Sequence, residues 1–138
     1  MIWQWIPHSA AVHMPLAIAV LFPVFFAAAW WTTRRGLMPE RIWLGLWALS
    51  AAQVASTVLA FFSGEHAEFL SAGSQVLIEK HEALAEKFLW VWVAIFVVFT
   101  ATRIPRFNKL ALWTVALLIA VQLILAVQAG HAGGQLLN

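Results

Sequence analysis

The sequence predicts an all-α integral membrane protein in which four transmembrane helices form a bundle of two antiparallel hairpins. The 138-residue chain is 63% hydrophobic and only 10% charged, a composition typical of integral membrane proteins. Four apolar runs are separated by short polar or basic segments. By its length the chain forms a single domain. The few basic residues flank the apolar runs, which is typical of a membrane topology signal and not of nucleic-acid binding.

The first predicted span, residues 10–31, is long enough to cross the hydrocarbon core of a bilayer. Pro15 and Pro23 lack a backbone N–H, so we expect this helix to kink and its freed carbonyl groups to find other partners. No basic segment precedes the run, whereas Arg34 and Arg35 follow it. This pattern favours a permanent first helix over a cleaved signal peptide, with its N-terminus outside the cytoplasm.

The second span covers residues 42–62, and the last two cover residues 79–102 and 110–130, with the third helix beginning near Gln75. Gln53 and Thr57 lie four residues apart, so they share one helix face, where we expect them to join helices through hydrogen bonds. The Trp and Phe side chains are expected to face lipid or the membrane interface. Four spans place both termini on one side, and the basic linkers predict that this side is the periplasm.

Residues 63–87 form the one polar segment, predicted to lie at the periplasmic side, and contain five of the six acidic residues and two of the five histidines. Such a concentration of ionisable groups in an apolar chain indicates a functional site. Four potential ligands lie 21, 22, 22 and 24 residues from an Arg or Lys of the basic linkers, namely His13, His81, His131 and Glu65. At a rise of about 1.5 Å per residue, all four reach the same level near the periplasmic face.

Imidazole and carboxylate groups that converge in a helical bundle suit a transition metal such as Fe, Zn, Cu or Mn. Glu68 lies one turn after Glu65, and Glu82 follows His81 directly. The predicted metal ligands are therefore His13, Glu65, Glu68, His81, Glu82 and His131. The spacing leaves open whether they hold one ion or two.

The sequence resembles an uncharacterised bacterial membrane family, domain of unknown function 2231, over essentially the whole chain. The resemblance rests on four motifs in order, His13-Met14-Pro15, Gly64-Glu65-His66-Ala67-Glu68, His81-Glu82 and His131-Ala132-Gly133-Gly134. Met14 departs from the Phe expected in the family, and His66 is an addition of this chain. The resemblance implies a four-helix membrane fold in the bacterial inner membrane, and candidate site residues His13, Glu65, His81, Glu82 and His131. An association of such relatives with Rieske or cytochrome domains implies redox work.

The leading functional prediction is a non-haem metal-binding membrane protein engaged in redox or electron transfer, which as an enzyme would be a metal-dependent oxidoreductase. One alternative is a b-type cytochrome whose haem takes axial ligands from His13, His66, His81 and His131 and exchanges electrons with quinol or a periplasmic carrier. A non-catalytic membrane subunit and a metal-dependent hydrolase are further alternatives. The expected partners are the lipid bilayer and a quinol or periplasmic redox protein, with no nucleic acid and with a homo-oligomer left open.

Overall fold

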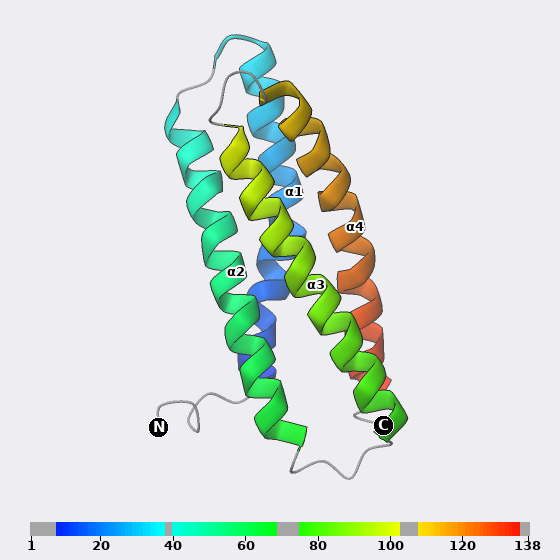
Figure 1. Cartoon of the computed structure of the whole chain (residues 1–138). Coiled ribbons are helices and arrows are strands. Elements are labelled where there is room, and N and C mark those ends of the chain that lie inside the picture. Colours follow the sequence, from blue (N-terminus) through cyan, green and yellow to red (C-terminus); the bar gives the residue numbers. More distant parts are fainter. Residues whose placement is uncertain (1–7, 38–39, 69–74, 103–107, 136–138) are drawn as a thin grey trace.

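The computed structural model describes residues 8–37, 40–68, 75–102 and 108–135, and these residues form an all-helical bundle (Figure 1). Its helices run alternately up and down, so that α1 and α3 begin at the end of the bundle where α2 and α4 finish. The elements are α1 (His8–Arg34), α2 (Glu40–Glu68), α3 (Gln75–Ala101) and α4 (Asn108–Gln135). The contacts of α1 with α2, of α3 with α4 and of α2 with α3 are extensive, whereas α1 and α4 touch more sparsely.

Each of the four described helices is long and apolar enough to cross a membrane. The predicted spans at residues 10–31, 42–62 and 110–130 lie within α1, α2 and α4, and the one at 79–102 passes the end of α3 by one residue. The third helix begins at Gln75, where the sequence predicts its start. Because α2 continues to Glu68, much of the polar segment at residues 63–87 is helical. Large apolar side chains are exposed along the outer faces, among them Val20, Val24, Trp90, Leu117 and Ile124. Such an outer surface is suited to hydrocarbon contact.

The end of α1 is set by Gly36, which has a φ of 70°. Its N–H donates to the Thr33 carbonyl at 3.0 Å, and the N–H of Leu37 donates to the Thr32 carbonyl at 3.1 Å. This pair of bonds is the Schellman arrangement, in which a left-handed residue satisfies the last helical carbonyls. Glycine adopts that conformation without the steric penalty of a Cβ atom. The sequence therefore encodes a sharp stop before the chain returns as α2.

The core is built largely from aromatic side chains of α1 and α3. On α3 the buried residues Phe88, Trp92, Ile95 and Phe99 recur every three or four positions and so form one inward stripe. The Trp92 ring lies edge-on to Phe22 of α1, with 5.2 Å between the ring centroids. The expectation that Trp and Phe face lipid or the interface is wrong for these buried rings. Because the outer faces of the helices are equally apolar, the sequence pattern does not mark which face is inward.

Two buried glutamines hold α1 against the helices on either side of it. Gln53 of α2 donates its side-chain N–H to the Pro15 carbonyl, and Gln122 of α4 donates to the Ala19 carbonyl, both at 2.9 Å. In a regular helix the Ala19 carbonyl would accept a hydrogen bond from the backbone N–H of residue 23. Residue 23 is a proline and has no backbone N–H. The prediction that Gln53 joins helices is confirmed. Gln122 supplies the partner that the second proline requires.

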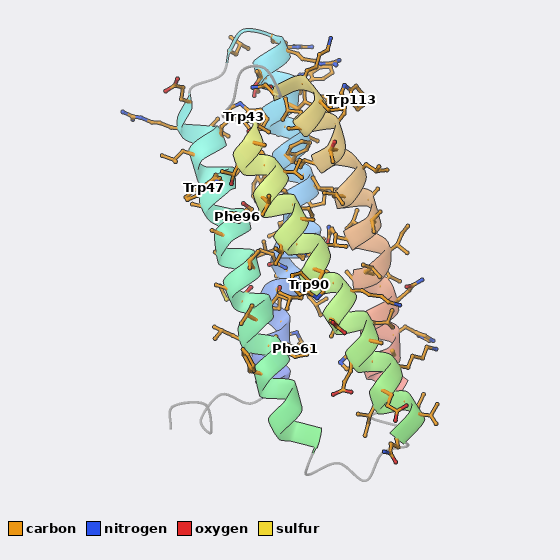
Figure 2. All side chains as sticks on the ribbon, in the orientation of Figure 1. Trp43, Trp47, Phe61, Trp90, Phe96 and Trp113 are labelled. Carbon is orange, nitrogen blue, oxygen red and sulfur yellow. The ribbon has the colours of Figure 1, made fainter. Side chains whose placement is uncertain are left out.

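Tryptophans form further links at the opposite end of the bundle from the start of α1 (Figure 2). The indole N–H of Trp43 donates to the Thr33 hydroxyl at 3.0 Å and connects α2 to α1. In the same way, the indole N–H of Trp47 donates to the Thr100 hydroxyl at 3.0 Å and connects α2 to α3. A buried or half-buried indole needs such a partner for its single N–H. These bonds fix the rotation of α2 relative to both neighbours.

The role of Gln122 can be tested with a double-mutant cycle. Gln122→Leu is expected to lower the free energy of unfolding by about 1 kcal/mol, because the Ala19 carbonyl loses its donor. Pro23→Ala restores a backbone N–H that can bond to the same carbonyl, so the cost of Gln122→Leu is expected to fall towards zero in that background. Unfolding titrations in mixed micelles measure both values. An equal cost in the two backgrounds would contradict this account of the bond.

Candidate metal site at the histidine end

The two ends of the bundle differ in their charged residues. The first residues of α1 and α3 and the last residues of α2 and α4 lie at one end of the bundle, which we call the histidine end (Figure 1). We call the opposite end the basic end. The described cations of the basic end are Arg34, Arg35, Arg41 and Lys109. The helices carry every predicted ligand into the terminal turns of the histidine end. The sequence-derived expectation that these residues share one level is consistent with this placement.

The described ligands differ in how far they are turned inward. His81 and Glu82 are half-buried, whereas His13 and His131 are exposed. Among the residues that the structure describes, no three His or acidic side chains come together in a group that could hold a metal ion. The structure thus brings His13, His81, Glu82 and His131 to one end of the bundle without gathering them into one coordination sphere.

Three further residues of the prediction are on the last turns of α2. The side chains of Glu65, His66 and Glu68 lie outside the described residues. Their backbone is helical, and the three-residue spacing of Glu65 and Glu68 therefore places both on one side of the helix. Their part in a metal site stays a prediction.

His81 is the predicted ligand with the clearest structural signature. It precedes Phe88 by seven residues, or two helical turns, and so continues the inward stripe of α3 to the histidine end. Its Nδ1 atom is buried and has no hydrogen-bond partner among the described residues. Glu82 lies one position further on, about 100° around the helix. A buried polar nitrogen without a partner is uncommon in native proteins and points to a group that completes it.

Comparison with known proteins gives no match: no family model, curated protein or solved structure matches this chain. The resemblance to domain of unknown function 2231 therefore stays a prediction. The chemistry of the site rests on the residues themselves.

The side chains around His81 provide a mixed electrostatic setting. Glu79, Lys80, Glu86 and Lys87 are wholly or partly exposed on the first turns of α3, where opposite charges alternate along the helix. A neutral imidazole can present the lone pair of Nδ1 to a metal ion, or it can accept a hydrogen bond at that atom. The adjacent carboxylates favour a cation over an anion. The described part of the site is thus suited to a single metal-facing imidazole supported by acidic groups.

Two polar residues in the core were not singled out by the sequence interpretation. Gln122 and Trp92 are fully buried, and each has a buried polar atom without a partner among the described residues. Counting residues from the basic linkers, which places the histidines at one level, also gives a signal for Gln122. Gln53 lies 12 residues after Arg41 and Gln122 lies 13 after Lys109, so the two glutamines share one level. Trp92 gives no comparable signal, because its neighbours in sequence are apolar on every side.

The unpartnered nitrogen of His81 leads to a stability prediction for protein stripped of metal. With a chelator present, His81→Leu is expected to leave the free energy of unfolding unchanged or to raise it by about 1 kcal/mol, because an unpaired buried polar group is removed. Lys80→Leu, on the exposed side of the same turn, is the matched control. A loss of about 2 kcal/mol or more for His81→Leu alone would show that its imidazole is paired within the protein.

Proposed function

We propose that this protein is a multi-pass membrane protein that binds a transition metal at the histidine end of its helical bundle. The observation that supports this most directly is the buried, unpartnered Nδ1 of His81. A metal-ligating histidine presents one ring nitrogen to the ion and uses the other for a hydrogen bond or solvent. His81 has the position for this role, because it lies two turns before Phe88 on the inward stripe of α3 and its Nδ1 atom is buried.

The remaining ligands of the proposed site come from the same turn of α3 and from the other helix ends. Glu82 lies beside His81, and Glu65 and Glu68 on the last turns of α2 would supply charge to balance the ion. His13 and His131, which are exposed in the described structure, would have to turn towards His81 to join the first coordination sphere. The proposed ions are Fe, Zn, Cu or Mn, and either one or two ions fit this donor set.

The orientation and reaction follow from charge and from metal chemistry. The cations of the basic end would face the cytoplasm under the positive-inside rule, and the metal would then face the periplasm of an inner membrane. There an Fe, Cu or Mn ion, whose oxidation state can change, would serve redox or electron-transfer work with a quinol or a periplasmic redox protein; Zn has no such chemistry. A site at the end of the bundle is reachable from the aqueous side of the membrane, which exchange with a periplasmic redox protein requires.

The test of this proposal is the metal content of the purified protein. Wild-type protein in detergent is expected to contain about one or two equivalents of one transition metal per chain. His81→Leu is expected to reduce that content at least tenfold. Loss of a group that hydrogen-bonds to a metal ligand typically lowers metal affinity about 10- to 100-fold, and loss of the ligand itself costs more. Lys80→Leu, which replaces an exposed neighbour, is expected to retain the wild-type content.

Two outcomes would count against the non-haem site. Equal metal in wild type and His81→Leu would contradict the role given to His81. A sharp α-band in the reduced-minus-oxidised spectrum would replace the non-haem ion with a b-type haem, for which the same histidines are the candidate axial ligands.

A further inference from the structure

Three buried polar atoms in the centre of the bundle have no hydrogen-bond partner among the described residues. They are the Oε1 atoms of Gln53 and Gln122 and the Nε1 atom of Trp92. All three side chains have an exposed fraction of 0%. They come from α2, α4 and α3, so every helix around α1 contributes one of them. In native structures such atoms are almost always paired with protein or with ordered water.

The side chains that bear these atoms contact the same short stretch of α1. The amide groups of the two glutamines are fixed by the carbonyls of Pro15 and Ala19, one turn apart on the inward face. The Trp92 ring packs against Phe22, the next inward residue of α1, with 5.2 Å between centroids. From Pro15 to Phe22 the helix rises roughly 10 Å, which bounds the height of the region. Gln53 Nε2 also lies 3.4 Å from the Thr57 hydroxyl, which adds a further polar group at this height.

The chemistry of the three atoms selects their ligand. The two glutamine oxygens accept hydrogen bonds, so they need a donor, whereas the indole N–H donates and needs an acceptor. A metal cation would satisfy the oxygens and leave the N–H unpaired, and an anion would do the reverse. Water both donates and accepts, and its small size suits polar atoms of side chains that are fully buried. We propose that the centre of the bundle binds a small cluster of ordered water that bridges Gln53, Gln122 and Trp92.

This internal water would complete the hydrogen bonding that begins at the α1 carbonyls. Each glutamine uses its side-chain N–H for the backbone of α1, which leaves the buried oxygen of the same amide group without a partner among the described residues. Water at that place bonds to both oxygens and to the indole without requiring the side chains to change their hold on α1. Buried waters typically make about three hydrogen bonds to groups that would otherwise be unpaired. The proposed site offers three such groups.

Resonance Raman spectroscopy of the indole tests the water bond directly. The difference between the ultraviolet spectra of wild type and Trp92→Phe isolates the signal of Trp92. The band that reports indole N–H hydrogen bonding is expected at the frequency of a bonded N–H. A band at the frequency of a free N–H would overturn the proposal. Should Trp92→Phe fail to fold, cross-relaxation between water and the indole proton in isotope-labelled wild type decides the question, and its absence would also overturn it.

Coupling between the side chains tests whether they share the same water. Trp92 and Gln122 have no direct hydrogen bond, yet a shared water would make their substitutions non-additive. The melting temperature of Trp92→Phe with Gln122→Leu is expected to fall by less than the sum of the two single changes. Trp47→Phe with Gln122→Leu is the matched control and is expected to be additive, because Trp47 bonds to Thr100 at the basic end. Additive behaviour in both pairs would contradict a shared water.

Discussion

The hydrogen bond from Gln122 to the Ala19 carbonyl is the interaction on which the arrangement of α1 depends. Because Pro23 has no backbone N–H, this carbonyl lacks its regular hydrogen-bond donor, and an unpaired carbonyl in the middle of an apolar bundle costs free energy. Gln122 supplies the donor from α4, although the contact between α1 and α4 is otherwise sparse. The helix can therefore contain Pro23 without an unpaired Ala19 carbonyl, because the neighbouring helix carries an amide at the same height.

The helices differ in the side chains that they bury in the core. The inward faces of α1 and α3 are mostly apolar, with large aromatic rings that fill the centre, whereas those of α2 and α4 include Gln53 and Gln122. Interhelical hydrogen bonds of this kind contribute roughly 0.6 kcal/mol each, so packing must supply most of the association energy. The glutamines fix the axial register of the helices. The rings, such as Phe22 against Trp92, fill the volume that this register defines.

The sequence predicts the number of helices, the start of α3 and the joining role of Gln53, because these depend on length, composition and spacing. It does not predict which side chains face inward. One residue changes the direction of a side chain by about 100°, so residues at one level can point towards the core, as His81 does, or be exposed, as His13 is. In a soluble helix the polar face would reveal the direction, but here both faces are apolar, so the sequence pattern does not distinguish buried aromatic rings from those that face lipid.

The two glutamines also indicate how the bundle departs from an internal repeat. Gln53 and Gln122 are 69 residues apart, as are Gly64 and Gly133, and α2 and α4 occupy equivalent places in the two hairpins. A regular repeat would have each glutamine bond to the first helix of its own hairpin. Gln53 follows this rule, but Gln122 bonds to α1 instead of α3, because Pro23 leaves the Ala19 carbonyl without a backbone donor and α3 contains no proline. Pro23 therefore makes α1 the helix that receives both glutamine bonds, whereas α3 presents its aromatic stripe and, at the end of that stripe, His81.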